Sequence, residues 1–289
     1  MLEGRHSHTA QRVALRRAAH RLLDRPLVHD DPLALRIIGA ADADALRKHP
    51  EDFERGPISP FLRAFLAARS RIAEDALASA VGAGVKQYVV MGAGLDTFAY
   101  RNPFPGLRVF EVDHPATQAW KRERLAGGSI DVPDSVTFAP IDFETQRLTD
   151  VLRAVGVDAS QPAFFSWLGV TPYLETATTL STLGELAPFA KGQRAGGAGG
   201  GVVFDYSVPP ESLPLIQRAA FEMLAKRVRD AGEPFRGFFD PAALGASLRT
   251  LGFAHVTDLG GDEINARLFA DRSDRLRVGS AGRIVIARV

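Results

Sequence analysis

Short apolar runs alternate with helix-like stretches from residue 86 to the end of the chain. Apolar strands that are separated by helices are typical of a parallel sheet with both faces covered. Because strand connections of this kind are right-handed, they predict a doubly wound architecture. The last two runs predict a hairpin at the sheet edge. The seven runs are "KQYVVMG", "LRVFEVD", "SVTFAPID", "AFFSWLGV", "GVVFDYSV", "FAHVTDLGG" and "RIVIARV".

We therefore expect an α/β fold with a doubly wound, mostly parallel seven-stranded sheet in residues 85–289. Residues 1–84 show helical spacing instead, and are expected to form a helical cap segment. Asp31–Pro32 and Ser59–Pro60 each place a capping side chain before a proline, as at a helix start. A late insertion near residues 262–282 is long for a turn, and we expect it to pack over an edge or to cover a site.

The charge balance and the absence of cysteine exclude several classes of function. The 289 residues carry 35 Lys and Arg against 34 Asp and Glu, a formal net charge of +1. This balance gives no overall attraction to nucleic acid or to an anionic membrane surface. Without cysteine, disulfides, thiolate nucleophiles and Cys-ligated metals are excluded, and no metal is expected. No uncharged apolar stretch approaches the ~20 residues that span a bilayer, so we expect a soluble, cytoplasmic protein.

A tight turn of Gly92, Ala93 and Gly94 follows the first predicted strand. In open α/β sheets ligands bind beyond the carboxyl ends of the strands, and glycines let the backbone approach a ligand closely. Asp113 ends the second predicted strand, nineteen residues beyond Gly94. A carboxylate at that place can accept hydrogen bonds from both hydroxyls of a ribose. The alternative is that Asp113 caps a helix that begins at Pro115.

Positions near this turn distinguish between nucleoside cofactors. Thr97 stands where the dinucleotide fingerprint has a third glycine, and Asp96 places a carboxylate where a pyrophosphate would lie. S-adenosylmethionine has no phosphate and carries a positive sulfonium and ammonium, so these residues favour it over NAD. Asp142 ends the third predicted strand and is expected to accept from the adenine amine, with Phe143 packing beside the ring. The alternative is that Asp142 caps "FETQRL".

Longer stretches resemble a known family. They are "VVMGAGLDTFAYR", "FEVDHPATQAWKRERL", "IDFETQRL", "FFSWLGVTPYLE" and "GEPFRGFFDPAALGASLRTLGF". Together they resemble the leucine carboxyl methyltransferases, a class I family that depends on S-adenosylmethionine. The resemblance covers nearly the whole chain and implies a Rossmann-like core with an N-terminal helical lid. The cofactor contacts that it implies are Arg69 for the carboxylate, the loop of Gly92, Ala93 and Gly94, Asp113 for the ribose, and His114, Asp142 and Phe143 for the adenine.

The chain departs from the family at the end of the fourth predicted strand. Many relatives have a glutamate there that helps to hold the cofactor's amino group, whereas this sequence has Leu168 at that cofactor-binding position. The departure implies that main chain or another acid, such as Glu175, makes the contact.

The resemblance implies methyl transfer to a carboxylate or hydroxyl of a small molecule, or to a peptide C-terminus. A carboxylate is ionised at pH 7 and needs no base, whereas a hydroxyl usually needs one. None of the histidines has catalytic spacing, which favours a carboxyl acceptor. The expected acceptor contacts are Tyr173 and Tyr206, past two strands, and Arg17 on the first helix. The alternative for each tyrosine is core packing or a hydroxyl at the sheet edge, and the alternative for Arg17 is a solvated face. The alternative functions are a NAD-dependent oxidoreductase and a non-catalytic methyltransferase-like binding protein.

Overall fold

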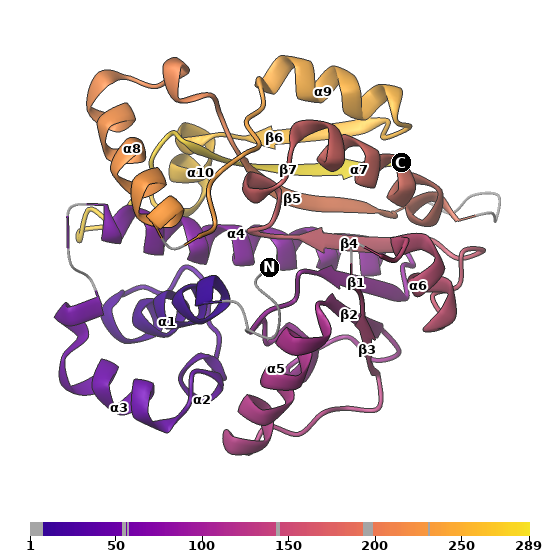
Figure 1. The fold of residues 1–289 in the computed structure, drawn as a ribbon, viewed down its shortest axis with the longest axis horizontal. Coiled ribbons are helices and arrows are strands. Elements are labelled where there is room, and N and C mark those ends of the chain that lie inside the picture. The colour runs from indigo at the N-terminus through magenta and orange to yellow at the C-terminus, as the bar shows by residue number, and fades with distance from the viewer. Residues whose placement is uncertain (1–7, 54–55, 57, 143–144, 193–198, 231) are drawn as a thin grey trace.

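The computed structural model describes residues 8–53, 56, 58–142, 145–192, 199–230 and 232–289, and Figure 1 shows it as a ribbon. Within these residues seven strands form one sheet in the order β3-β2-β1-β4-β5-β7-β6. Six of the seven predicted runs contain one of these strands, and β7 begins one residue before the seventh run. The strands are β1 (Gln87–Met91), β2 (Arg108–Asp113), β3 (Val136–Pro140), β4 (Ala163–Trp167), β5 (Gly201–Ser207), β6 (His255–Leu259) and β7 (Gly282–Arg288).

The sheet is mixed, which corrects the expectation of a mostly parallel one. β1 pairs in parallel with β2 and β4, and parallel pairing continues outward to β3 and β5. β7 lies between β5 and β6 and is antiparallel to both. The chain leaves β6 and enters β7 at the same end of the sheet, so β7 runs back along its neighbour. This is the expected antiparallel edge pairing, although a helix interrupts the connection.

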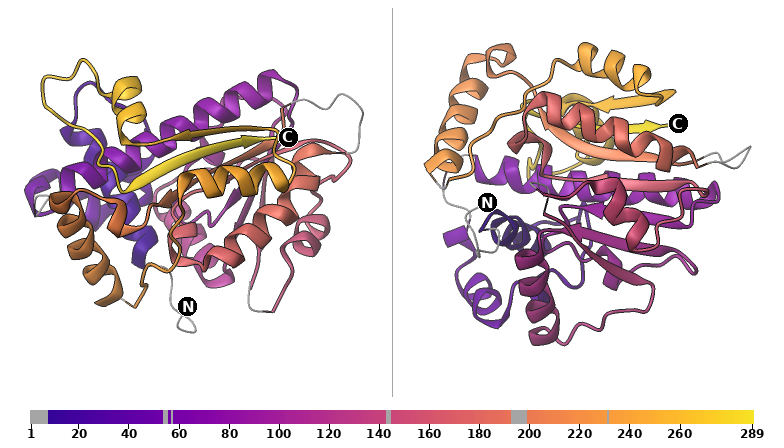
Figure 2. Two further views of the ribbon diagram at one scale, coloured as in Figure 1. Left: turned by 90° about the horizontal axis from the view of Figure 1, so that it is seen from above. Right: turned by 45° about the vertical axis from the view of Figure 1, so that its right-hand side comes forward.

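Helices cover both faces of the sheet (Figure 2). Alternate residues of a strand point to opposite faces: Tyr88 and Val90 share a core with α4 and α10, and Val89 and Met91 share one with α6, α7 and α9. None of the described helices combines the length and the apolar composition that a bilayer crossing requires. The helices are α1 (His8–Leu23), α2 (Ala34–Ile37), α3 (Ala40–Lys48), α4 (Ser59–Gly82), α5 (Pro115–Gly127), α6 (Leu148–Ala154), α7 (Thr176–Lys191), α8 (Leu215–Asp230), α9 (Pro241–Thr250) and α10 (Gly261–Leu268).

The helices α1, α2 and α3 form a smaller core together with α5. Its buried members include Ile37, Leu46 and Trp120, and Leu95 of the glycine turn joins them. In contrast, α4 packs along the sheet, so the predicted cap of residues 1–84 contains a sheet helix as well as the three helices before it. The division at residue 84 remains a prediction.

The late insertion packs on α4. Ile264, Phe269 and Val278 belong to the same buried cluster as α4, and Arg267 of α10 pairs with Asp75 of α4 at 3.0 Å. Because these contacts bury the apolar side chains of the insertion, it behaves as part of the helical layer on this face of the sheet.

Candidate active site

Two positions of the glycine turn after β1, Gly92 and Gly94, favour a residue without a side chain. Gly92 and Gly94 have φ values of 63° and 43°, in the left-handed region that glycine adopts most readily. A Cβ on Gly92 would lie 2.5 Å from Cγ2 of Val170, which follows β4. The N–H groups of Gly92 and Ala93 donate to the carbonyl of Val112 at 2.8 and 3.1 Å, which fixes the turn to β2. The turn therefore brings bare backbone to the carboxyl ends of β1, β2 and β4.

Asp113 is fixed at the end of β2 by two backbone donors. Its Oδ2 accepts from the Gly94 N–H at 2.6 Å, and its Oδ1 accepts from the His114 N–H at 2.7 Å. Burial raises the pKa of Asp113, against the lowering effect of these two donors. The cap of α5 is His114, whose Nδ1 accepts from the Ala116 N–H, so the alternative role of Asp113 as the helix cap is wrong. Each carboxylate oxygen keeps a second lone pair for a ligand hydroxyl.

Asp142 lies beside Asp113, at the end of the neighbouring strand. The Ile141 N–H donates to the Asp113 carbonyl at 2.9 Å, which joins the two strand ends. The Asp142 N–H donates to Oε1 of Gln146 at 3.0 Å. α6 begins at Leu148, and part of "FETQRL" lies outside the described residues, so the alternative that Asp142 caps this segment stays a prediction. Phe143, the other predicted adenine contact, lies outside the described residues.

A buried ion pair lies at the ends of β4 and β5. Nη1 of Arg69, from α4, donates to Oδ2 of Asp205 in β5 at 2.9 Å, and the Gly169 N–H donates to Oδ1 of Asp205 at 2.6 Å. Arg69 and Asp205 are only 8% and 3% exposed. Gly169 has a φ of 73°, and a Cβ there would lie 2.8 Å from Nη2 of Arg69. The glycine at this position therefore lets the backbone of the turn after β4 lie directly against the guanidinium of Arg69.

Within the described residues, Leu168 and Glu175 form no hydrogen bond or ion pair with Arg69 or Asp205, and a contact of Glu175 with the cofactor remains a prediction. Leu168 is half-buried and packs against the cluster that contains α4. Glu175 precedes α7, makes no side-chain cap there and is exposed. The carboxylate that the structure places beside the turn after β4 is Asp205, which sequence reasoning missed.

A family model described as leucine carboxyl methyltransferase matches residues 10–187. The chain belongs to the leucine carboxyl methyltransferase family. "Putative S-adenosyl-L-methionine-dependent methyltransferase YktD" of Bacillus subtilis is 31% identical over 302 residues, which cover 96% of this chain and 95% of that protein. A relative of the same description from Mycobacteroides abscessus is 37% identical over 172 residues, 59% of this chain and 56% of its own length. A DUF574-family protein of Streptomyces avermitilis has a similar fold, with a TM-score of 0.53, 14% identity and full coverage of both chains.

In this methyltransferase, residues of "LDT" (95–97) and Arg101 hold the first helices to the glycine turn. Thr97 is fully buried, and its hydroxyl donates to Oδ2 of Asp31 at 2.8 Å. Nη2 of Arg17 donates to the same oxygen at 3.2 Å and to the Leu95 carbonyl at 2.9 Å. Nε of Arg101 lies 3.5 Å from Oδ1 of Asp31. Arg17 is thus buried in an ion-pair network, and the alternative of a solvated face is wrong; its contact with an acceptor remains a prediction.

The network continues from Arg101 to α4. Both Nη atoms of Arg101 donate to the Glu74 carboxylate, and Nε2 of His29 lies 2.9 Å from its Oε1. Burial alone would raise the pKa of Glu74, but the hydrogen bonds and charges of His29 and Arg101 lower it to about 2. The first helices are therefore joined to α4 as well as to the glycine turn.

Glu111, the first residue of "EVDHP", forms a further buried ion pair with Lys121 of α5. Glu111 and Lys121 are both almost fully buried, with their charged atoms 2.7 Å apart. Tyr100 donates to the same carboxylate at 2.8 Å, and Gln118 donates to the Glu111 carbonyl at 2.8 Å. These contacts hold α5 against β2, which keeps His114 and Asp113 at the strand end. Lys121 is therefore buried as the structural partner of Glu111.

The two predicted tyrosines lie in different places. Tyr173 ends a short 3-10 helix, η3 (Thr171–Tyr173), directly after β4 and near the Arg69 pair. Tyr206 lies within β5 and not past it; it is 1% exposed, and its hydroxyl donates to Asp258 of β6 at 2.7 Å. The structure therefore brings Tyr173 to the other predicted residues and leaves Tyr206 in the core.

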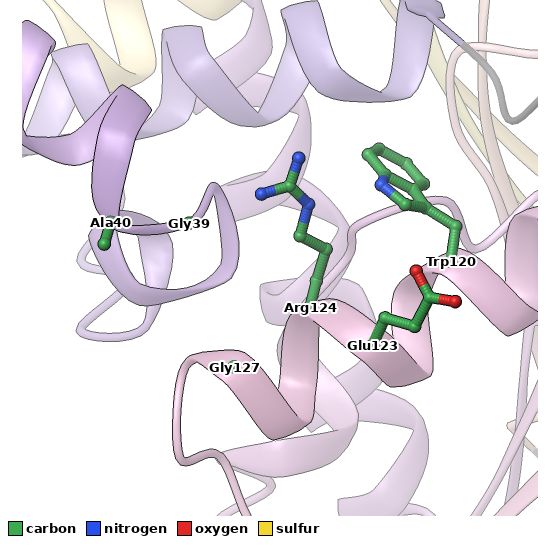
Figure 3. A pocket seen from close by; sticks show the side chains of 6 residues that line it. All are labelled: Gly39, Ala40, Trp120, Glu123, Arg124 and Gly127. Atoms are coloured by element: carbon green, nitrogen blue, oxygen red, sulfur yellow. The ribbon is translucent and has the colours of Figure 1, made fainter.

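A pocket between α5 and the junction of α2 and α3 contains none of the predicted site residues (Figure 3). Its most prominent side chain is Arg124, which donates to the Ile38 carbonyl at 3.1 Å and lies over the ring of Trp120. These contacts use Arg124 to join α5 to the first helices, so this pocket is a packing feature.

Proposed function

We propose that this methyltransferase transfers the methyl group of S-adenosyl-L-methionine to an oxygen atom of a small-molecule or peptide acceptor. When bound, the cofactor supplies a methyl group that its sulfonium already activates. The protein then has to hold donor and acceptor in line at near contact. The observation that carries the proposal is the Asp113 carboxylate, held at the carboxyl edge of the sheet by the Gly94 and His114 N–H groups.

The residues at the strand ends fit the parts of this cofactor. Asp113 has lone pairs available for the ribose hydroxyls, and Asp142 lies at the next strand end for the adenine amine. At the other side of the glycine turn, the Arg69–Asp205 pair matches the zwitterionic amino-acid group: the guanidinium suits a carboxylate and Asp205 suits an ammonium. This arrangement supports a role for Asp205 where relatives use a glutamate at the Leu168 position.

The glycine turn does not suit a pyrophosphate. Oδ1 of Asp96 accepts from the Phe98 N–H at 2.8 Å, so a carboxylate stays at the start of the short helix that follows the turn. A negative charge at that position would repel phosphate, whereas it is compatible with a sulfonium. This observation favours S-adenosyl-L-methionine over NAD.

The first helix is proposed to act as a cap over the bound cofactor. A Cβ on Gly94 would lie 3.1 Å from Cβ of Ala10, so the first turn of α1 rests on the glycine turn. Arg17 and Asp31 hold α1 in that position through the network described above. The cap would exclude water from the methyl group and would form one wall of the acceptor site.

Replacing Asp113 with alanine is expected to weaken the binding of S-adenosylmethionine by about 10- to 100-fold. The reason is the loss of charge-assisted hydrogen bonds to the ribose, worth about 1.5–3 kcal/mol each. Isothermal titration calorimetry measures the change, and Asp134→Ala, at an exposed aspartate, is the matched control. Unchanged affinity in the Asp113 variant would remove the main support for this function.

A further inference from the structure

A polar group that the sequence did not indicate lies above the ends of β4 and β5. The Thr9 hydroxyl, at the start of α1, donates to Oε2 of Glu233. Burial and the negative charges of Glu233 and Asp205 raise the pKa of Tyr173 to about 12, against the opposing effects of Arg69 and of a hydrogen bond with Thr9. Thr9, Tyr173 and Glu233 are therefore neighbours, close to the Arg69–Asp205 pair.

The segment that carries Glu233 is fastened across the carboxyl edge of the sheet. The N–H groups of Arg236 and Gly237 donate to the Pro172 carbonyl at 2.8 and 3.2 Å, and the Phe239 N–H donates to the Ser207 carbonyl at 3.0 Å. A Cβ on Gly237 would lie 2.5 Å from the Leu174 carbonyl oxygen, so this backbone touches the chain after β4. Residues 233–239 thus run from α8 over β4 and β5.

Glu233 and the glycine turn are brought together through α1. Thr9 binds Glu233, and its neighbour Ala10 rests on Gly94. Figure 1 shows α1 and α8 on either side of the end toward which β4 points. The Glu233 carboxylate consequently lies on the acceptor side of the proposed cofactor site, between the cap and residues 233–239.

Aromatic rings form the wall behind Tyr173. The ring centroids of Tyr173 and Phe235 are 5.4 Å apart, and those of Phe235 and Phe221 are 5.5 Å apart in a stacked arrangement. Phe238 meets the edge of Phe221 at 6.0 Å. Phe221 is buried in the core, whereas Tyr173, Phe235 and Phe238 are partly exposed at its margin, where a flat aromatic ligand could stack on a ring or meet it edge to face.

The charge of the site argues against an anionic acceptor. Among the described residues, no cation pairs with Glu233 within 4.0 Å, whereas Arg69 is already paired with Asp205. A carboxylate acceptor would approach an uncompensated negative charge and would be repelled. A hydroxyl acceptor would instead donate to that charge.

We propose that Thr9, Tyr173, Glu233 and the phenylalanines form an acceptor site for an aromatic hydroxyl compound, and that Glu233 is its general base. This inference rests on the proposed function. As the acceptor oxygen bonds to the methyl carbon, the carbon–sulfur bond breaks and its electron pair stays on sulfur. The hydroxyl proton passes to Glu233 and then to water, so the products are a methyl ether and S-adenosylhomocysteine. Thr9 holds Oε2 and so orients the carboxylate for this transfer.

The test uses the full chain, S-adenosylmethionine labelled in its methyl group, and aromatic pairs that differ only in the acceptor group, such as 2-naphthol and 2-naphthoate. We expect label in a base-stable ether of the naphthol, with transfer to the naphthoate at least about tenfold slower. Glu233→Gln should lower kcat for the naphthol by about a hundredfold, the usual scale for loss of a general base. Glu211→Gln, at an exposed glutamate, should leave kcat unchanged.

Binding of S-adenosylhomocysteine to each variant separates this inference from the function on which it rests. If the Glu233 variant binds it as the unaltered protein does, the variant is folded and its cofactor site is intact. With binding intact, preferred transfer to naphthoate, no transfer to any aromatic hydroxyl in the panel, or unchanged kcat in Glu233→Gln would each overturn the acceptor site. Absence of binding in the unaltered protein would overturn the proposed function itself.

Discussion

Replacement of Arg69 by methionine is expected to weaken the binding of S-adenosylhomocysteine by roughly a hundred- to a thousandfold and to leave 5′-methylthioadenosine binding unchanged. Loss of one partner from a buried, hydrogen-bonded charge pair costs about 2–5 kcal/mol. Arg69 is buried against Gly169 in the turn after β4, where we expect the amino-acid group of the ligand to lie. Methylthioadenosine has no amino-acid group, so its affinity should not depend on Arg69. Calorimetric titration of both ligands measures the difference.

Two further variants control for effects on folding. Arg71→Met lies on the same helix, but Arg71 is half-exposed and pairs with Asp75, so both affinities should stay unchanged. Arg69→Met also leaves Asp205 buried without its cation, and the double variant Arg69→Met/Asp205→Asn removes that uncompensated charge. An equal loss of affinity for both ligands would mean that Arg69 supports the fold and does not bind the amino-acid group of the ligand.

The strands could be predicted because strands that are buried on both faces of a sheet consist mainly of apolar residues. The runs that contain β1, β2 and β4 are largely apolar on both faces and have a glycine or an aspartate at or near their ends, which marks where these strands stop. The antiparallel pairing of the last two strands was predicted as a hairpin, but the position of β7 between β5 and β6 was not, because a strand's composition does not show which strand lies beside it. α3 was not predicted either: "AADADALRK" buries only Ala43 and Leu46, which is a weak periodic pattern.

The site was predicted where a residue follows a strand and missed where it lies inside one. Gly92 and Asp113 mark strand ends, and strand ends meet at one edge of a parallel sheet. Asp205 lies within an apolar strand, and its partner Arg69 is 136 residues away in sequence, so no spacing relates them. A charged residue inside a buried strand was the available signal. Tyr206 follows Asp205 directly, and strand alternation turns it to the opposite face, away from α4.

Removal of the Asp31 side chain is expected to lower the free energy of unfolding by about 3–5 kcal/mol, the usual loss when a buried charge pair is broken. Asp31 is 2% exposed and binds Arg17, Thr97 and Arg101, so Asp31→Ala leaves the buried Arg17 and the partly buried Arg101 without this partner. Asp30→Ala is the matched control, because Asp30 is the neighbouring residue in the sequence and its exposed carboxylate pairs with Arg21 at the surface. Such a pair contributes at most about 1 kcal/mol. Urea denaturation at pH 7 measures both variants, and equal values would show that the Asp31 network adds nothing to stability.

The same network predicts how stability depends on pH. Burial alone would raise the pKa of Asp31, but the charges of Arg17 and Arg101 bring it below its ordinary value. The pKa of Glu74 is lowered from 4.5 to about 2. A carboxylate with a lowered folded-state pKa stabilises the fold above its unfolded pKa and loses that contribution as pH falls toward the folded value. The unaltered protein should therefore lose stability between about pH 4.5 and pH 2. The Asp31→Ala variant should lose less of its free energy of unfolding over this interval, because one of the two carboxylates is already absent. A larger loss in the variant would mean that groups outside this network cause the acid sensitivity.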